Sequence, residues 1–226
     1  MTENQPKSAR TVESLTYVVE QLEEEVIFGR LRPRERLVEE DLVTRFEVKR
    51  HIIRQALIEL ERMGIVVRQR GKGARVCDYS PEEVQDLYLV RQLLESKAAS
   101  LIPLPASKGL LKDLGSIHRA YAKSVKDGNL RGIFRGNVRF HQTLFAACGN
   151  PYLTEAINLY ATKANVIRFY VGRDPGMFAG ARDEHGAIIE ALQDGDRERL
   201  IDLCVRHLQP SPKAYIDAYR GLFGNS

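Results

Sequence analysis

The first third of the chain places hydrophobic residues at helical spacing and then in short strand-like runs. Over residues 11–28 the hydrophobic positions recur every three to four residues, which predicts an amphipathic helix. Gly71 and Gly73 lie in the tight connection between the two strand-like runs and supply the backbone freedom that a hairpin needs. We expect helices over 11–28, 39–46 and 49–63, followed by hairpin strands over 65–68 and 74–77. Residues 11–78 are therefore predicted to form a domain of three helices and a hairpin, after a flexible N-terminus over residues 1–10.

The remainder of the chain keeps helical spacing, with almost no strand signal. Ser80 is suited to be an N-cap and Pro81 to be the first helical residue, so residues 79–81 have the composition of a hinge before a new helix. We expect helices over 82–101, 107–126, 130–148, 151–172, 178–193 and 197–208, with a last one after Pro212. Residues 82–222 are predicted to form an antiparallel all-α bundle, which makes the fold class mainly α.

Composition and charge narrow the classes of protein that fit. The content of 43% hydrophobic and 28% charged residues is typical of a globular protein, and no apolar run approaches the roughly 20 residues of a membrane helix. Three widely spaced cysteines and the absence of an apolar signal segment predict reduced thiols and a cytoplasmic location. Residues 49–75 contain eight basic and only two acidic residues, a local net charge of +6 that suits a polyanionic partner.

The short second helix, the tight turn and the longer third helix have the order of a winged helix-turn-helix. The basic first turn of the third helix would enter the major groove of DNA, where arginine side chains match guanine or phosphate groups. The hairpin tip would act as a wing on the DNA backbone or in the minor groove. The predicted DNA-binding residues are Lys49, Arg50, His51 and Arg54 on the helix, and Arg70 and Lys72 on the wing. The alternative is that these residues form the exposed face of an ordinary amphipathic helix.

Several histidines of the predicted bundle suit a metal site. Asn137 and His141 are four residues apart and therefore share one helix face, while His185 and His207 belong to the next two predicted helices downstream of residue 172. Imidazole nitrogens suit zinc or nickel, and Asn137 offers a carbonyl oxygen. Spacing alone leaves open the alternative that each histidine is an ordinary hydrogen-bonded residue of the bundle.

Residues 27–77 resemble the DNA-binding domain of the GntR family of bacterial regulators. The stretches IFGRLRPRERLVEEDLVTRF and VKRHIIRQALIELERMGIV follow the pattern of that family. Lys49, His51–Ile52 and Gln55 depart from the usual residues, whereas Arg50 and Arg54, the two arginines that the family uses on DNA, are retained. The resemblance implies a DNA-binding protein whose departures affect which operator it reads.

Residues 82–222 resemble the ligand-binding domain of the FadR subfamily of GntR regulators, the FCD type, and their number of helices favours the VanR branch. The motifs are RQLLE at 91–95, NVRFH at 137–141, EHGAIIEALQDGD at 184–196 and the later His207. The resemblance implies a divalent-metal site formed by Asn137, His141, His185 and His207, with zinc as the first candidate and nickel as the second. Asn137 stands where Asp is commoner, and the loss of a carboxylate weakens binding of a hard cation.

The resemblance also implies an effector cavity beside the metal. Arg91 is the predicted anchor for a carboxylate effector, and the alternative is that it pairs internally with Glu95 or another acid. Tyr88, Arg135, Asn165 and Arg168 are predicted to line the same cavity. The sequence thus predicts a homodimer or higher oligomer that binds a pseudo-palindromic operator, most simply as a repressor, and senses a small organic acid. A metal-dependent enzyme and a DNA-binding protein without an effector remain the alternatives.

Overall fold

The computed structural model describes residues 7–69, 73–170 and 175–223. The chain divides into two compact units, Met1–Tyr79 and Ser80–Ser226, and each is described by itself. The first unit has three helices and a small sheet, and the second is helical throughout its described residues. This arrangement confirms the predicted fold class of a winged helix-turn-helix followed by an all-α bundle.

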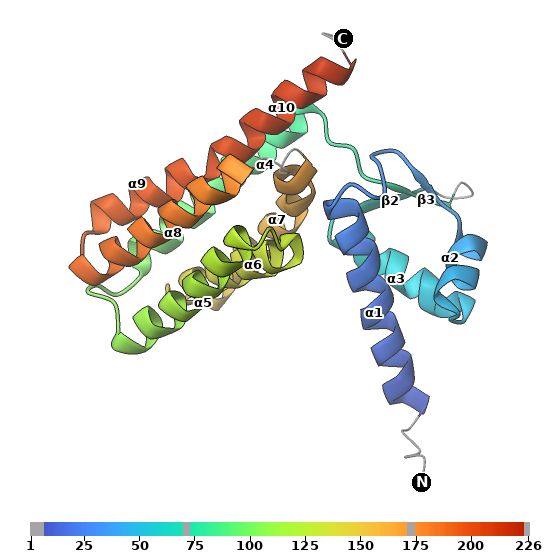
Figure 1. Ribbon diagram of the computed structural model, residues 1–226, viewed down its shortest axis with the longest axis horizontal. Helices are drawn as coiled ribbons and strands as arrows, with labels where there is room; N and C mark the ends of the chain where they lie inside the picture. Colours follow the sequence, from blue (N-terminus) through green and yellow to red (C-terminus); the bar gives the residue numbers. More distant parts are fainter. Residues whose placement is uncertain (1–6, 70–72, 171–174, 224–226) are drawn as a thin grey trace. The chain divides into compact units, whose positions relative to one another are not determined.

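The first unit packs three helices beside an antiparallel sheet (Figure 1). Its elements are α1 (Lys7–Ile27), β1 (Arg36–Leu37), α2 (Glu39–Phe46), α3 (Arg50–Arg62), β2 (Val66–Gln69) and β3 (Gly73–Val76). The strand order is β1-β3-β2, so β3 is the central strand. Strand β1 was not expected from the sequence; it pairs with β3 through Arg36 opposite Arg75 and Leu37 opposite Ala74. The buried residues of α1 and α3 face each other and form the core of this unit.

Two turns of the first unit hold non-glycine residues in the left-handed conformation. Arg34 has a φ of 67° and follows Pro33 in a turn closed by a 3.0 Å hydrogen bond from the amide of Glu35 to the carbonyl of Arg32. This is the geometry in which glycine is usually preferred at the second central position. Glu47 has a φ of 52° and ends α2, three residues before α3 begins at Arg50. The left-handed residue reverses the chain within a few residues and brings α2 against α3.

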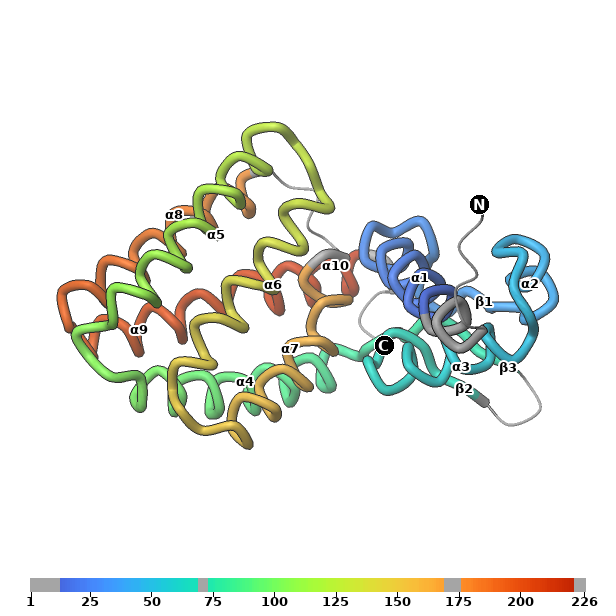
Figure 2. The backbone as a smooth tube through the Cα atoms, turned by 90° about the horizontal axis from the view of Figure 1, so that it is seen from below, coloured from blue at the N-terminus to red at the C-terminus, as the bar shows by residue number. Residues whose placement is uncertain are grey.

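The second unit is a bundle in which the helices pack as antiparallel neighbours (Figure 2). Its elements are α4 (Pro81–Leu101), α5 (Lys108–Lys126), α6 (Leu130–Ala146), α7 (Pro151–Tyr170), α8 (Pro175–Asp194), α9 (Arg197–Leu208) and α10 (Pro210–Phe223). Helix α5 packs against α6 and α8, and α4 packs against α7 and α9. The predicted helices start and end within a few residues of those observed, and the predicted end of the fourth one at 172 lies outside the described residues.

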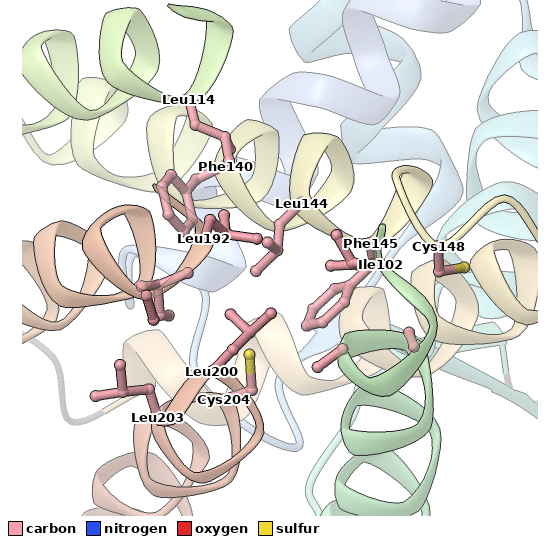
Figure 3. Packing of buried hydrophobic residues seen from close by; sticks show 14 of the residues in the cluster. Ile102, Leu114, Phe140, Leu144, Phe145, Cys148, Leu192, Leu200, Leu203 and Cys204 are labelled. Atoms are coloured by element: carbon pink, nitrogen blue, oxygen red, sulfur yellow. The ribbon is translucent and has the colours of Figure 1, made fainter. Parts of the chain in front are cut away.

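Local signals and a shared core explain why these helices form. Ser80 accepts a hydrogen bond from the amide of Glu83, whose side chain accepts one from the amide of Ser80, so the predicted N-cap of α4 is a full capping box. Helices α4 to α9 each contribute side chains to one hydrophobic cluster, which includes Phe140, Leu192 and Leu200 (Figure 3). None of the described helices is long and apolar enough to cross a membrane.

Candidate functional site

The outer face of α3 carries the basic residues that the sequence predicts to bind DNA. Lys49, Arg50, His51 and Arg54 are all exposed, whereas Ile52, Ile53, Ala56, Leu57 and Leu60 of the same helix are buried. The buried face holds α3 against α1 and α2, so the basic face is left for a partner. Arg70 and Lys72 of the predicted wing tip lie outside the described residues.

Both arginines of this face are paired with acidic residues from the first turn of α2. The Nε atom of Arg54 donates a 2.9 Å hydrogen bond to Glu39, and Nη2 of Arg50 lies 3.0 Å from Oε1 of Glu40. The side chains of Arg54 and Glu39 are 57% and 27% exposed, and those of Arg50 and Glu40 are 53% and 62% exposed. Ion pairs at this level of exposure contribute little to stability, so a phosphate or a base edge can replace them.

Three helices of the bundle bring His141, His185 and His207 together. They come from α6, α8 and α9, and the nitrogen atoms that each could offer to a metal lie within 4.8 Å of one another. The Nε2 atoms of His141 and His207 are 3.0 Å apart, and Nδ1 of His207 is 2.5 Å from Oε2 of Glu184. The carboxylate of Glu184 orients the ring of His207 so that its Nε2 faces the other two histidines, as outer carboxylates do at metal-binding histidines.

The protonation and hydrogen bonding of the cluster fit a metal ion. Burial lowers the pKa of His141 and of His185 well below the ordinary value, and the adjacent His207 lowers both further. The two imidazoles are therefore neutral, which is the form that binds a metal. Both ring nitrogens of His185, Nδ1 of His141 and Nδ2 of Asn137 are buried without a hydrogen-bond partner among the described residues. Because buried polar atoms are nearly always satisfied, this set of donors fits a bound ion or ordered water.

A cavity of about 320 Å³ opens next to the histidines. Asn137 and His207 line it together with Arg168 of α7 and with Tyr121 and Glu184, and Met177 and Phe178 of α8 provide apolar wall. This volume is at the lower end of the range for small-molecule sites, and the mixture of apolar wall and few polar groups is typical of them. The cavity therefore places a small ligand within reach of both the histidine cluster and a cation.

Arg168 lines this cavity as a cation, and the Glu184 carboxylate lines it too. Arg168 forms no hydrogen bond or ion pair with the described residues, and burial, with Arg91 nearby, lowers its pKa. Arg91 differs, because both Nε and Nη2 contact Oε1 of Glu95, at 2.9 and 2.8 Å. Burial opposes the charge of Arg91, but the Glu95 carboxylate holds the pKa of Arg91 above its ordinary value. The structure has the internal Arg91–Glu95 pairing that the sequence left open as the alternative.

The other predicted effector residues do not gather at the 320 Å³ cavity. Asn165 and Arg91 line a separate space of about 20 Å³, which Arg168 also borders and which is too small for a metabolite. The ring of Tyr88 lies 4.9 Å from the guanidinium carbon of Arg91, and Arg135 lies at the same distance from the ring of Phe134. Neither Tyr88 nor Arg135 borders either space as described. Whether these residues affect effector binding stays a prediction.

Two ionisable residues that line the cavity were not predicted from the sequence. Glu184 directly precedes His185, and its position within the EHGAIIEALQDGD motif was a usable signal. Tyr121 comes from α5, where it lies among helical hydrophobic positions like any other core residue. Burial raises the pKa of Tyr121 to about 12, so its hydroxyl stays protonated. It donates a long hydrogen bond of 3.5 Å to the carbonyl of Phe178, which an acceptor on a ligand in the cavity could replace. Nothing in the local sequence distinguishes it from an ordinary core tyrosine.

Comparison with known proteins assigns both units. Residues 86–210 match the FCD domain, and residues 16–76 match the bacterial regulatory proteins of the gntR family. Since the first match alone covers more than half of the chain, the chain belongs to the GntR regulators whose second domain is of the FCD type. The protein is thus a transcriptional regulator with a DNA-binding domain and an effector-binding domain.

Individual relatives agree with this class. The HTH-type transcriptional repressor GlaR of Escherichia coli is 27% identical over 197 residues, which cover 83% of this chain and 89% of that protein. The gluconate operon transcriptional repressor of Bacillus subtilis is 24% identical over 194 residues, 81% of this chain and 77% of that one. Among solved structures, E. coli McbR/YncC superposes with a TM-score of 0.77 at 17% identity, covering 91% of this chain and 98% of that one. This last similarity concerns the fold.

Proposed function

We propose that this regulator is a homodimeric repressor whose affinity for a pseudo-palindromic operator changes when a small organic acid binds in the bundle. The observation that carries the proposal is the shared cavity of Arg168 and the histidine cluster. Arg168 is partly withdrawn from water and forms no ion pair with the described residues, so an anionic ligand in the cavity would offset the cost of its desolvation. The two relatives named as repressors support the direction of regulation.

His141, His185 and His207 would hold a divalent metal, with Asn137 contributing an oxygen. Three imidazoles favour zinc and then nickel, and they carry no negative charge. When bound, the metal supplies a Lewis-acidic position for a carboxylate oxygen. Glu184 keeps His207 oriented, and the neutral state of His141 and His185 leaves their nitrogens ready as ligands. Arg168 would bind a second oxygen of the same acid, and Tyr121 would donate a hydrogen bond to it.

DNA binding would use the exposed face of α3 from each protomer. Two-fold symmetry of a dimer matches two half-sites, and Arg50 and Arg54 would contact the major groove of each. The ligand can change DNA affinity only if it binds more tightly to one arrangement of the protein than to the other. Residues 79–81, at the division between the two units, are the proposed place where that difference is transmitted.

The test of the ligand site is a thermal-shift comparison with a panel of mono-, di- and tricarboxylic acids on zinc-loaded protein. At least one acid should raise the unfolding temperature of the wild type, and that shift should disappear in Arg168→Met, because the anchor is gone. Arg139→Met is the matched control, since Arg139 is an exposed residue of α6 that does not line the cavity. An acid that shifts wild type and Arg168→Met equally would contradict the proposed anchor.

The metal site is tested by elemental analysis of the purified protein. Wild type should hold about one zinc ion per chain and His185→Ala much less, because three imidazoles are needed for stable binding. His118→Ala is the control, as His118 is a histidine of the same bundle outside the cluster. Equal metal content in wild type and His185→Ala, with both proteins folded by circular dichroism, would remove His185 from the site.

A further inference from the structure

The first turn of α2 directs two carboxylates at the DNA-facing arginines of α3. Glu39 accepts the hydrogen bond from Nε of Arg54 at 2.9 Å, and Glu40 lies 3.0 Å from Nη2 of Arg50. A regulator that binds a polyanion has an electrostatic reason to keep carboxylates away from its contact face, because each one repels the phosphates. Two acids placed directly against the DNA-binding arginines therefore need an explanation.

The two ion pairs differ in how firmly the structure holds them. The Glu39 side chain is only about a quarter exposed, whereas more than half of the Glu40 side chain is exposed. Arg54 and Glu39 form a hydrogen bond with good geometry. Arg50 and Glu40 lie close enough for an ion pair but do not form a hydrogen bond. The surrounding protein already restricts a half-buried carboxylate, so it loses less side-chain entropy when it pairs with an arginine. Glu39 therefore restricts the side chain of Arg54 more than Glu40 restricts that of Arg50.

The contact with Glu39 uses Nε of Arg54 and leaves the terminal end of the guanidinium available for DNA. Among the described residues only Nε of Arg54 has a partner, so the terminal Nη1 and Nη2 groups keep their donors for another contact. Those two groups form the end-on fork that matches O6 and N7 of guanine in the major groove. A fork whose direction is already fixed loses less conformational entropy on binding than a free arginine does.

We propose that Glu39 is a positioning residue that fixes the Arg54 guanidinium for base recognition and thereby raises the preference of this regulator for its operator over other DNA. The proposal rests on the assignment of Arg54 to the DNA contact. Glu39 acts in two ways that reinforce each other. It preorganises the specific contact, and its negative charge weakens the sequence-independent attraction to phosphates. Glu40 has the second effect only, because its contact with Arg50 is exposed and exchangeable.

The experiment measures two affinities for each variant. One probe is a duplex selected by the wild-type protein from a randomised library, and the other is a random-sequence duplex of equal length. Glu39→Gln should lower affinity for the selected duplex about threefold to tenfold, the size of one typical net hydrogen bond, because glutamine keeps an acceptor but loses the charge. Its affinity for the random duplex should rise slightly, because one negative charge is lost. Glu40→Gln, the matched control from the same helix turn, should raise both affinities alike and leave their ratio unchanged.

A double-mutant cycle separates positioning from a general effect on folding. In the Arg54→Ala background, Glu39→Gln should no longer change the ratio of the two affinities, because the group that it orients is absent. Glu39→Asp provides a second variant, which keeps the charge but shortens the side chain and should lower affinity for the selected duplex without raising it for the random one. A ratio in Glu39→Gln equal to that of wild type, or an equal fall of the ratio with and without Arg54, would overturn the proposal.

The same data judge the underlying assignment separately. If Arg54→Ala binds the selected duplex as tightly as wild type does, the assignment of Arg54 to base recognition fails, whatever Glu39 does. If Arg54→Ala loses about tenfold or more, as the loss of a bidentate arginine–guanine contact predicts, the assignment stands. Only the behaviour of Glu39→Gln and Glu39→Asp then decides whether Glu39 positions Arg54.

Discussion

Both units contain arginine–glutamate pairs, and these differ most in their exposure to water. On α3 the pairs of Arg50 and Arg54 are largely solvated, whereas Arg91 and Glu95 of the bundle are 1% and 3% exposed. An exposed pair is readily exchanged for another anion, but breaking a buried pair leaves an uncompensated charge in a medium of low polarity. The exposed arginines are thus suited to binding a polyanion, and Arg91 is suited to holding α4 in the bundle.

The largest expected effect comes from breaking the buried pair. Glu95→Gln should lower the free energy of unfolding by about 3–5 kcal/mol, because Arg91 is left charged and without a partner inside the bundle. The measurement is urea denaturation followed by circular dichroism. Glu40→Gln on the first unit is the comparison and should change the free energy by about 0.5 kcal/mol or less. A similar fall in the free energy of unfolding in both variants would contradict the proposed difference between buried and exposed ion pairs.

Acid should affect the bundle next most strongly. In the folded, chelator-treated protein burial lowers the pKa of His141 and of His185 well below the value of about 6.5 expected in the unfolded chain. Below pH 6.5 the unfolded chain therefore binds protons that the folded one does not, and stability falls as the pH falls. Two histidines give a slope of up to about 2.7 kcal/mol per pH unit, measurable from urea midpoints between pH 7.5 and 5.5. A His141→Gln/His185→Gln variant should have a shallower slope; an unchanged slope would assign the effect to other groups.

Arg91 and Arg168 of the bundle should respond in opposite directions to the same substitution. Arg168→Met should stabilise the ligand-free protein by about 1 kcal/mol, because it removes a charge that desolvation and the nearby Arg91 disfavour and that forms no ion pair with the described residues. Arg91→Met should destabilise it, because Glu95 is then left unpaired. Thermal unfolding of both variants without ligand makes the comparison. Destabilisation of both to the same extent would indicate that Arg168, too, is a structural residue.

The smallest expected effect concerns the turn that brings the exposed pairs together. Glu47→Gly should raise the free energy of unfolding by about 0.5–1 kcal/mol, since glycine adopts the left-handed conformation without the strain of a side chain. Thr44→Gly, in the interior of α2, is the matched control and should lower it by a similar amount. Urea midpoints distinguish the two outcomes, and a loss in both variants would show that the Glu47 side chain contributes more than its strain costs.

The helices could be predicted from the sequence because helical periodicity is a local property. The buried positions of α3 are those that the hydrophobic pattern predicts. The N-cap of α4 involves only the four consecutive residues from Ser80 to Glu83, so it too can be recognised locally. Strand β1 was missed because two residues carry no periodicity, and its pairing with β3 depends on residues almost forty positions later. The local sequence pattern therefore predicts helices and strands, but it does not predict which of them pack or pair with one another.

Some residues of the candidate site could likewise be predicted from the sequence, and others depend on how the helices pack. His141, His185 and His207 were found because a resemblance supplied the long-range information that spacing lacks, and the structure has their ring nitrogens close together. The sequence pointed to Arg91 as the anchor because an arginine within a bundle needs an anion, but it could not rank Glu95 against a ligand as that anion. Arg168 and Tyr121 reach the cavity from α7 and α5, so their role depends on how the helices pack.

The presence of Asn137 in place of an acidic residue affects how the proposed metal and acid sites would influence each other. A donor set of three imidazoles and one amide adds no negative charge, so a divalent ion held there would keep its full double charge beside Arg168. The bound acid would then neutralise the metal, and each would strengthen the binding of the other by the same factor. A regulator built in this way would respond to metal and acid jointly, and its response to either one alone would be weaker.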